Sequence, residues 1–491
     1  MFSLLLLPSL SFASDYLDVW ITTAFEDNNV FAGPDLYSPA ANFVQRGNTT
    51  FFENYERRVT DDISRANLVL YNESDGYFDN WSTQSAFVLR YTPFLNPDMT
   101  TPGTNLRDDG SYVRIIRKLP GKKHNISLTG YAVDAGRFRL GYSYDLTWGA
   151  RSIFSFDPGA VPGVRLQWQK QGSYAFLGMK SAVGDYITPD TREPRNQTYY
   201  GYLAGAGVLI ADKLKFEVGA GSFQQDQIKN VQDTENPLYG EIITALGFSG
   251  QISYRTRTDM RFLQSADLRL YQNKPEMMKD GYITHTDVDG FGALFQAEVN
   301  SLQHNLLDPL NQESTTIESA LAADVQARVG FNTTFLEVDL VYKDLAYILF
   351  NVPGLTSGVA MDPDMEQTAQ IYGRANVSHH MKDIHITPQI GAGWMLPATY
   401  KTSGGTFVQY TAFDKEQVPD GQEPSPILSS VAGVQIDLSP STVFVGEVLY
   451  SVDNNLSDFV QEEGSLEGRR VSAPAEERQA LGFNLMIRSR F

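Results

Sequence analysis

Apolar and polar residues alternate along most of this sequence with a period of two, in one short segment after another. Neighbouring side chains of a β-strand point to opposite faces, so the pattern predicts strands with one apolar and one polar face. In residues 137–148, Phe138, Leu140, Tyr142, Tyr144, Leu146 and Trp148 would share one face, and Arg137, Arg139, Gly141, Ser143, Asp145 and Thr147 the other. Residues 321–331 repeat the pattern before a tight turn at Asn332-Thr333. We therefore predict an all-β protein.

Composition excludes several classes of protein. With 42% hydrophobic and 12% aromatic residues, the chain is too apolar to be mainly disordered. It has no cysteine, which excludes disulfides, a thiol nucleophile and Cys-ligated zinc. The 39 Lys and Arg residues are outnumbered by 58 Asp and Glu residues, and the net charge is -19. Because nucleic-acid binding needs a basic surface, nucleic acid is not an expected partner.

The N-terminal segment is apolar and uncharged, and it ends in the small residue Ala13. This is typical of an export signal, which we expect over residues 1–13; a buried N-terminal strand or helix is the alternative. No later stretch approaches the roughly 18 consecutive apolar residues that a membrane-spanning helix requires. An exported chain of this kind is either soluble or crosses a membrane as strands.

Three features favour strands that cross a membrane. The apolar faces often end in an aromatic residue, as at Trp148, Tyr342 and Trp394, and the opposite faces carry charges of both signs. Short turns also alternate with long polar connections. The short turns are 135–136, 170–172, 211–213, 332–333 and 439–441, and the long connections include 151–162, 184–197, 352–365, 399–424 and 452–477. Hydrocarbon cannot satisfy backbone N–H and C=O groups, so such strands must close into a ring.

We therefore predict a transmembrane antiparallel up-and-down β-barrel over residues 63–491. The expected number of strands is even, about 18, with 16 to 20 left open. The short and long connections fall out of phase between Tyr271 and Glu318, which indicates one strand missed or wrongly split there. Residues 14–62 fit the pattern poorly. They are left as a periplasmic extension, a lumen plug, or a first strand with a long loop.

The last strand carries a resemblance to a known class. One of its faces holds Leu481, Phe483, Leu485, Ile487 and Phe491, and the other holds Gly482, Asn484, Arg488 and Arg490. This resembles the closing strand of Gram-negative outer-membrane β-barrels, although Ser489 departs from the usual apolar residue. The resemblance names no subfamily. It implies a protein of the bacterial outer membrane whose assembly signal, Phe483, Leu485, Ile487 and Phe491, is read by the barrel-assembly machinery.

The polar faces of the strands would line a wet lumen. The candidates for lining it and setting ion selectivity are Arg137, Arg139, Asp145, Arg165, Asp267, Arg269, Asp324, Arg328, Glu337, Asp339 and Arg374. Opposing arcs of Arg and carboxylate would set a transverse field that orders dipolar solutes. Alternatively, these residues pair with one another across neighbouring strands. The acidic connection 452–477 would favour cations, bridge to lipopolysaccharide through divalent ions, or form an ordinary solvated loop.

The predicted function is that of a porin-like channel for passive diffusion of small hydrophilic solutes, with no cofactor, no metal and no catalytic residue. One alternative is a structural or adhesive barrel with an occluded lumen, and a second is a barrel hydrolase. The scattered histidines, including His379-His380, have no triad spacing. The expected partners are outer-membrane lipid, lipopolysaccharide, the assembly machinery and small solutes; a homo-oligomer is left open.

Overall fold

The structure, a computed structural model, describes residues 18–27, 29–31, 64–94, 103–121, 123–154, 158–188, 191, 193–229, 236–260, 262, 288–351, 358–410, 415–461 and 468–491. The expected export signal, residues 1–13, lies outside these ranges, as do the lumen candidates Asp267 and Arg269. Among the helices that are described, none is both long and apolar enough to cross a membrane.

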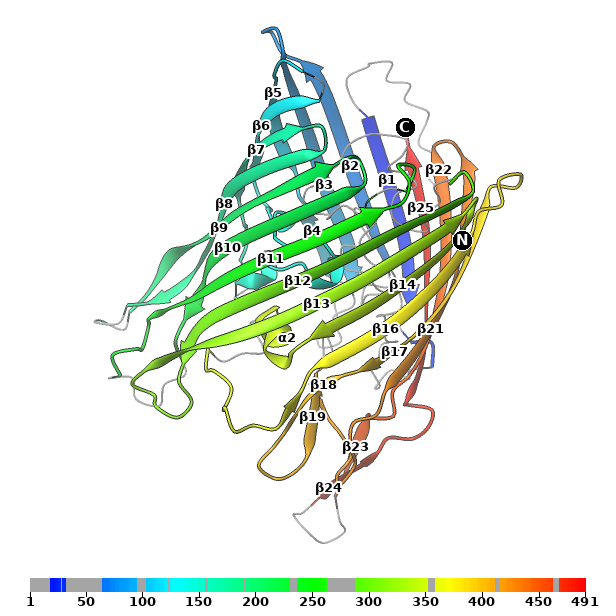
Figure 1. The fold of residues 1–491 in the computed structure, drawn as a ribbon. Coiled ribbons are helices and arrows are strands. Elements are labelled where there is room, and N and C mark those ends of the chain that lie inside the picture. Colours follow the sequence, from blue (N-terminus) through cyan, green and yellow to red (C-terminus); the bar gives the residue numbers. More distant parts are fainter. Residues whose placement is uncertain are drawn as a thin grey trace.

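The strands form a closed antiparallel barrel of 18 members (Figure 1), which confirms the predicted fold class and strand number. In chain order they are β1 (Asp18–Asp27), β2 (Ser64–Asp75), β3 (Trp81–Phe94), β4 (Gly103–Asp108), β5 (Tyr112–Lys118), β6 (His124–Tyr131), β7 (Gly163–Lys170), β8 (Ser173–Ile187), β9 (Pro194–Ile210), β10 (Leu214–Gln227), β11 (Ile242–Arg255), β12 (Phe291–Leu307), β13 (Thr315–Phe331), β14 (Thr334–Lys343), β16 (Gln370–His379), β17 (Ile386–Leu396), β21 (Ile427–Ser439), β22 (Thr442–Val452) and β25 (Gln479–Arg490). Because β4 and β5 pair one after the other along β3, they count as one member.

The barrel closes through its first and last strands. β1 pairs with β2 on one side and with β25 on the other, where Thr22 lies opposite Arg488. The backbone N–H of the terminal Phe491 donates to the carbonyl of Val19 at 2.8 Å. Residues 18–27 are thus a strand of the ring, one of the three possibilities left for residues 14–62; residues 32–63 lie outside the described ranges.

The two ends of the barrel differ. At the turn end, where Phe491 lies, the strands are joined by the short connections 76–80, 119–123, 171–172, 211–213, 332–333, 380–385 and 440–441. At the opposite loop end, the connections are mostly longer: 132–162, 188–193, 228–241, 308–314, 344–369, 397–426 and 453–478. The predicted short turns lie at the turn end, except for 135–136, which was wrong because these residues belong to the long connection 132–162 at the loop end.

The phase conflict near residue 271 has a different cause from the one expected. β11 and β12 pair directly, with Arg255 opposite Leu294, so β12 follows β11 in the ring. The connection 256–290 leaves β11 and enters β12 at the turn end, where Arg255 N–H donates to the Lys213 carbonyl and Val288 N–H to that of Asn332. The expectation of a missed or split strand was wrong. One turn-end connection is long, and when connections are assigned to the two ends by their length, it is assigned to the loop end.

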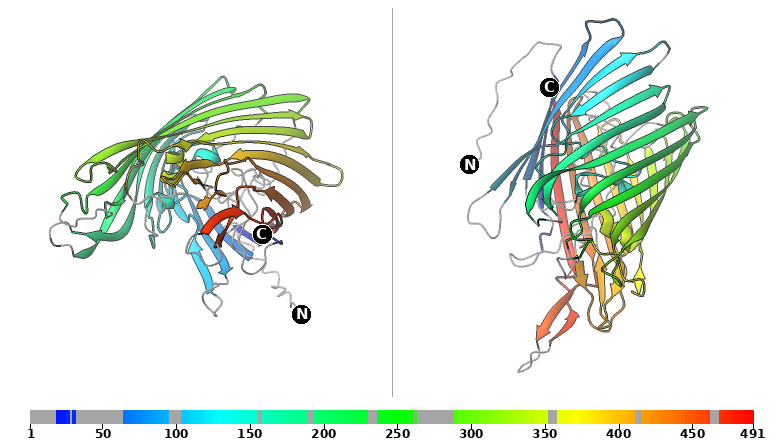
Figure 2. Two further views of the ribbon diagram at one scale, coloured as in Figure 1. Left: turned by 90° about the horizontal axis from the view of Figure 1, so that it is seen from below. Right: turned by 90° about the vertical axis from the view of Figure 1, so that its left-hand side faces the viewer.

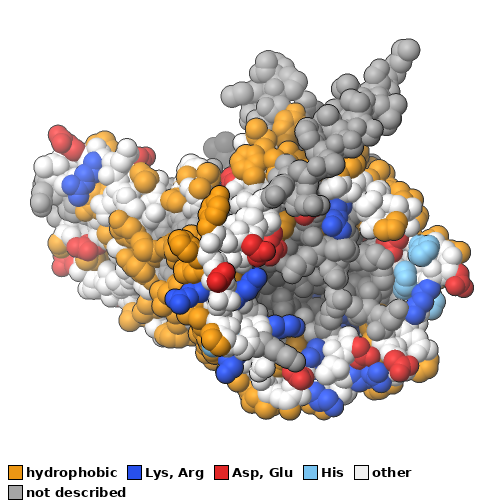
Figure 3. All heavy atoms as spheres, turned by 90° about the horizontal axis from the view of Figure 1, so that it is seen from above, with side chains coloured by type: hydrophobic (Ala, Val, Ile, Leu, Met, Phe, Trp, Pro, Cys, Tyr) orange, Lys and Arg blue, Asp and Glu red, His pale blue; other side chains and the backbone are white. Residues whose placement is uncertain are grey.

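The strands place apolar side chains outside and polar side chains inside. On β14, Leu336, Val338 and Leu340 are 42%, 43% and 50% exposed, whereas Glu337 and Asp339 are 8% and 1% exposed. Viewed from the turn end, charged side chains lie along the rim and hydrophobic ones on the outer surface (Figure 3). A closed ring with an apolar outside and a polar inside is the architecture of an outer-membrane β-barrel. The resemblance of the terminal strand to that class is thus confirmed for the fold.

The strand expected at 137–148 is not part of the barrel wall. β6 ends at Tyr131 and β7 begins at Gly163, and between them the chain folds inside the ring through two short 3-10 turns, η1 (Tyr144–Leu146) and η2 (Arg151–Ile153) (Figure 2). Phe138, Leu140 and Trp148 are 0%, 2% and 1% exposed, so they face protein and not lipid. Leu140 and Trp148 form an isolated antiparallel bridge. Apolar and polar residues alternate in any extended segment whose two faces have different surroundings. The alternation therefore does not show whether the apolar face contacts lipid or protein.

Smaller elements cover the loop end. The helix α2 (Leu345–Asn351) follows β14, and a short sheet joins β15 (Gln367–Thr368), β18 (Ala398–Lys401), β19 (Phe407–Tyr410) and β20 (Lys415–Gln417). A separate hairpin of β23 (Ser457–Gln461) and β24 (Gly468–Ser472) projects from the loop end, at the bottom of Figure 1. Leu345, Ile348 and Leu349 of α2 pack with Ala398, Val408 and Tyr410 of the short sheet.

Candidate functional site: the loop inside the barrel

The segment 132–162, called here the inner loop, is fixed at both ends. Ala135 N–H donates to the Val161 carbonyl at 2.6 Å, and Val161 N–H donates to the Val133 carbonyl at 2.8 Å. Because these bonds tie the two ends together beside β6 and β7, the middle of the segment is carried into the lumen as one unit.

The apolar side chains of the inner loop pack against glycines on the inner face of the wall. A Cβ at Gly178 on β8 would lie 2.7 Å from the Phe138 ring, and one at Gly219 on β10 would lie 3.1 Å from Leu140. A Cβ at Gly247 on β11 would lie less than 3.0 Å from the Trp148 ring, closer than real Cβ atoms pack. Each of these glycines therefore leaves a socket that one side chain of the inner loop fills.

Aromatic contacts reinforce this packing. Phe138 stacks on Tyr131 at 6.2 Å between ring centroids and meets Phe176 edge-on at 5.9 Å. Trp148 meets Phe223 edge-on at 5.7 Å, and its indole N–H donates to the Ser249 hydroxyl at 3.0 Å. Aromatic pairs in such geometries contribute about 0.5–1.5 kcal/mol each beyond their buried area. The loop is thus a packed part of the structure.

The tip of the inner loop is held by carboxylates of the wall. The backbone N–H of Tyr142 donates to both oxygens of Glu298 on β12, at 3.0 and 3.1 Å, and that of Ser143 donates to the same carboxylate. The Ser143 hydroxyl donates to Asp324 on β13. Glu298 and Asp324 are each 2% exposed. Both carboxyl groups therefore interact with the loop and not with bulk water.

Arg374 on β16 joins the loop tip to the wall. Its Nη2 lies 2.9 Å from Asp145 of the inner loop, and its Nε lies 2.7 Å from Asp339 on β14. The Tyr372 hydroxyl also donates to Asp145. Asp145, Asp324, Asp339 and Arg374, all proposed from the sequence, thus meet at one place, but Asp145 comes from the inner loop and not from a barrel strand.

Two further groups bind backbone carbonyls of the inner loop. The Lys180 ammonium on β8 donates to the Phe138 carbonyl at 2.8 Å and to that of Gly149. The Tyr347 hydroxyl, on α2, donates to the Leu146 carbonyl at 2.6 Å. Glu298 was expected from the sequence to face the lumen, whereas Lys180 and the glycine sockets were not predicted. A signal for the sockets was present in the sequence: glycines occur on the polar faces of β8, β10 and β11, where a strand that faces only water would carry polar side chains.

Charge is unevenly distributed around the wall. Five buried basic side chains lie on the inner faces of one run of strands from β25 to β7, in which only β1 and β6 carry none of them. They are Arg488 on β25, Arg65 on β2, Arg90 on β3, Arg114 on β5 and Arg165 on β7. The acids lie on β10, β12, β13 and β14: Glu217, Glu298, Asp324, Glu337 and Asp339. The lumen therefore has a basic arc and an acidic arc.

The contacts within the two arcs differ in kind. In the acidic arc, Arg328 pairs with Glu337 on the neighbouring strand at 2.9 Å, and Lys215 pairs with Glu217 on its own strand at 2.5 Å. In the basic arc, Arg114 donates to the Ser127 hydroxyl at 2.9 Å, and the Arg165 guanidinium lies 5.6 Å from the Phe138 ring centroid.

Two basic side chains of the inner loop itself, Arg137 and Arg139, are buried. Arg137 pairs with Asp109, at the junction of β4 and β5, at 2.9 Å, and Arg139 is 8% exposed. Both belong to the loop, whereas the sequence assigned them to a strand. They thus extend positive charge from the wall onto the segment that crosses the lumen.

Burial changes the acidity of two carboxyls outside the strands. It raises the pKa of Asp134, whose Oδ1 accepts the Gly136 N–H at 2.6 Å. It also raises the pKa of Asp344, which accepts the N–H groups of Tyr347 at 2.7 Å and Leu321 at 2.6 Å. In both cases removal from water disfavours the charged form more than the hydrogen bonds favour it.

The histidines form no catalytic constellation within the described ranges. His379 is hydrogen-bonded to Thr334 and His380 to Thr387, each at 2.8 Å, at the turn end. His304 stacks on Phe350 at 3.6 Å between centroids. Among the residues described, no group of three or more His, Asp or Glu is placed to hold a metal ion.

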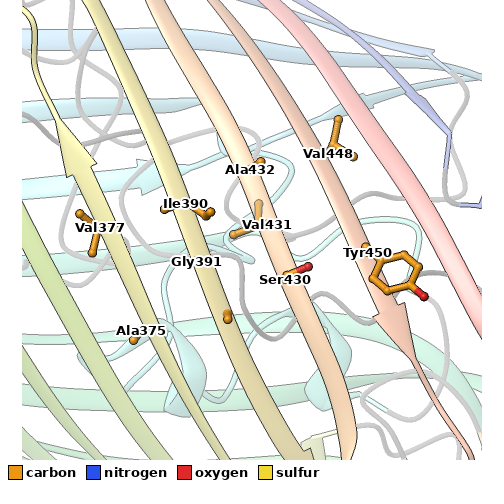
Figure 4. Close-up of a pocket in the computed structure, with 10 residues that line it drawn as sticks. Ala375, Val377, Ile390, Gly391, Ser430, Val431, Ala432, Val448 and Tyr450 are labelled. Atoms are coloured by element: carbon orange, nitrogen blue, oxygen red, sulfur yellow. The ribbon is translucent and has the colours of Figure 1, made fainter.

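A groove of about 420 Å³ lies on the outer surface across β16, β17, β21 and β22 (Figure 4). Its lining includes Val377, Ile390 and Val448, which are 43%, 66% and 47% exposed on the lipid side of the strands. It therefore does not belong to the solute path.

Similarity to known proteins is found among solved structures. No protein-family model matches the sequence, and no curated protein does. Among solved structures, the chain is similar to OmpT, an outer membrane protein of Vibrio cholerae, with 10% identity, a TM-score of 0.36 and 97% of each chain covered. It is also similar to the outer membrane protein OpdK from Pseudomonas aeruginosa, with 8% identity, a TM-score of 0.45 and coverage of 97% of this chain and 98% of that one. A third similar structure is OprD of Pseudomonas aeruginosa, with 9% identity, a TM-score of 0.45, and coverage of 97% of this chain and 94% of that one.

At these identities and TM-scores, the similar structures assign no activity to the chain. Its own closed ring and outward apolar band make it an integral outer-membrane β-barrel protein.

Proposed function

We propose that the protein is a channel of the bacterial outer membrane through which small hydrophilic solutes diffuse passively. The observation that carries the proposal is the charged interior of the ring, into which the inner loop is folded and fixed. A barrel that only anchored a surface loop would need no such lining. Solutes would pass between the inner loop and the basic arc, because the apolar side of the loop is packed against β8, β10 and β11.

The charge distribution supports selectivity in this channel. A basic arc facing an acidic arc sets a field across the lumen, in which a dipolar solute is oriented and ions are discriminated. No covalent chemistry or cofactor is part of this proposal.

Ion selectivity in planar bilayers tests the proposal. Replacing Arg114 and Arg165 by glutamine removes two cations from the basic arc, so the reversal potential in a salt gradient should shift toward cation selectivity. Arg117→Gln, on the outer face of β5, is the control and should leave the potential unchanged. Arg137→Gln and Arg139→Gln measure the contribution of the inner loop. A reversal potential that none of the lumen variants moves would contradict the role of the field.

A barrel with an occluded lumen is the second candidate. It is favoured by the inner loop and by α2, whose Tyr347 binds the inner loop from the loop end. Conductance separates the two functions: a folded protein that inserts into bilayers and never conducts would eliminate the channel.

Assembly of the barrel is also a proposal. Leu485 and Ile487 are 42% and 49% exposed on the outer face of β25, Phe483 is half-buried there, and the terminal Phe491 is 74% exposed. These apolar side chains follow one face of the strand that closes the ring. We infer that the assembly machinery binds this face before β25 pairs with β1.

A further inference from the structure

Three neighbouring hairpins at the turn end bring aromatic and basic side chains together on the outside of the barrel. They are the turns β2–β3, β5–β6 and β7–β8, at the top of Figure 1. The residues that matter are Phe78, Trp81, Arg117, Lys123, Trp168 and Lys170, called here the rim patch.

The three hairpins are held in contact. Lys118 N–H donates to the Asn80 carbonyl at 2.7 Å, and the Arg117 guanidinium lies 5.7 Å from the Trp81 ring centroid. On the other side, the Trp168 indole N–H donates to Nε2 of His124 at 2.9 Å, with the rings edge-on at 5.9 Å. The patch is therefore one continuous surface in which neighbouring side chains hold the rings of Trp81 and Trp168.

The rim patch is basic in an acidic protein. Its described turns carry Arg117, Lys118, Lys123 and Lys170, against the carboxylates of Asp75 and Asp79, whereas the whole chain has a net charge of -19. The ammonium of Lys118 lies 3.8 Å from Asp75, and both side chains are mostly exposed, so this pair is weak. A net positive charge thus remains on the exposed rim.

The aromatic residues of the patch are unusually exposed. Phe78 is 76% exposed and its neighbour Tyr77 is fully exposed at the tip of the β2–β3 turn. Trp81 and Trp168 are each 37% exposed on the outer faces of their strands. A soluble surface would not favour four such rings together.

The patch continues the lipid-facing band. Ile115 and Leu166, both 42% exposed, lie on the same strand faces two residues nearer the middle of the barrel than Arg117 and Trp168. Ile126, which is 39% exposed, lies opposite Arg117 and Trp168. The lipid-facing band therefore reaches the level of Trp81 and Trp168, where Arg117 lies opposite Trp81, and Lys123 and Lys170 lie closer to the turns. Trp and Tyr prefer this level, and Lys and Arg beside a membrane attract anionic lipids.

We propose that the rim patch binds the headgroup of an anionic phospholipid at the turn end of the barrel. The phosphate is held by Arg117, Lys123 and Lys170, and the rings of Trp81, Trp168 and Phe78 fix the barrel at the depth of that headgroup. An acidic soluble protein would match the charge, but it would not be in contact with the lipid-facing faces that carry Trp81 and Trp168. Lipopolysaccharide was expected at the opposite, loop end.

The experiment measures which lipids the folded protein retains. The purified barrel is reconstituted in vesicles of phosphatidylcholine mixed with phosphatidylglycerol, extracted in mild detergent, and analysed for bound lipid by mass spectrometry. The test variant is Lys123→Gln/Lys170→Gln. The matched control is Lys213→Gln/Lys382→Gln, which removes two exposed cations from other turns at the same end. A heat-dependent gel shift verifies that each protein is folded.

The wild type and the control should both enrich phosphatidylglycerol over phosphatidylcholine. The test variant should lose enrichment by about fivefold for each cation removed. Phe78→Ser should reduce total retained phospholipid without abolishing the preference for anionic lipid. Three results would overturn the proposal: no enrichment by the wild type, an equal loss in the control, or wild-type enrichment of added lipopolysaccharide in place of phosphatidylglycerol.

Discussion

Replacing Gly247 by alanine tests whether sockets in the barrel wall hold the inner loop. A Cβ at this position would lie less than 3.0 Å from the Trp148 ring and would also crowd Leu302. Trp148 is 1% exposed and is further fixed by its hydrogen bond to Ser249 at 3.0 Å. The ring has no free space to enter, so it must leave its place.

The expected magnitude follows from the cost of overpacking, which is about 1–3 kcal/mol. At about 1.4 kcal/mol for each factor of ten, the ratio of docked to undocked inner loop should fall by about 5- to 150-fold. The wall itself should persist, because the backbone pairing of Gly247 with Gly221 and Leu302 does not depend on its side chain. The variant should therefore insert as a barrel whose inner loop leaves its sockets more often.

Two assays detect this change. Single-channel recordings of Gly247→Ala should show larger or more frequent current fluctuations than the wild type. A water-soluble quencher should reach the Trp148 indole more readily. Gly250→Ala is the matched control, because it lies on the same strand and a Cβ there would have nothing within 4 Å. If the two variants behave alike in both assays, the socket argument is wrong.

Three further predictions concern other parts of the molecule. Arg374→Gln removes the guanidinium between Asp145 and Asp339, so the free energy of unfolding should fall by about 3–5 kcal/mol, measured by denaturant titration, with partial recovery in Arg374→Lys. Phe491→Ser should reduce the fraction of barrels that fold in the membrane, as judged by the heat-dependent gel shift; undiminished folding would argue against an assembly signal. Burial raises the pKa of Asp344 above its usual 3.8, so its contribution to the docking of α2 is present at acid pH and is lost as the pH rises through the raised pKa. Asp344→Asn should remove this pH dependence from the hydrogen exchange of the α2 amides, and an unchanged dependence would assign it to another group.

Much of the barrel could be predicted from local patterns. Segments such as β13 and β14 alternate cleanly on both sides of a two-residue turn, and side-chain direction in a strand depends only on position parity. The closing strand was also recognisable, because its apolar face runs to the last residue. The pairing of Arg328 with Glu337 follows from the same register.

The inner loop was beyond such reasoning. Residues 137–148 alternate as regularly as β14, yet their apolar side chains meet glycines of β8, β10 and β11 and not lipid. The contact joins residues far apart in the chain, such as Trp148 and Gly247, so no short window contains both partners. The same holds for Asp145 and Arg374, which were each proposed as lumen residues but without any reason to meet.

Periodicity, the aromatic ends and charged faces of the strands, the alternation of short and long connections and the last strand together predicted a closed membrane barrel, because strands that cross hydrocarbon must pair every backbone group. Tertiary structure alone decided which alternating segment enters the lumen, which glycines receive it, and that a long connection at the turn end joins β11 to β12. These features depend on the steric fit between strands that are far apart in the chain, whereas alternation describes only the two faces of one segment.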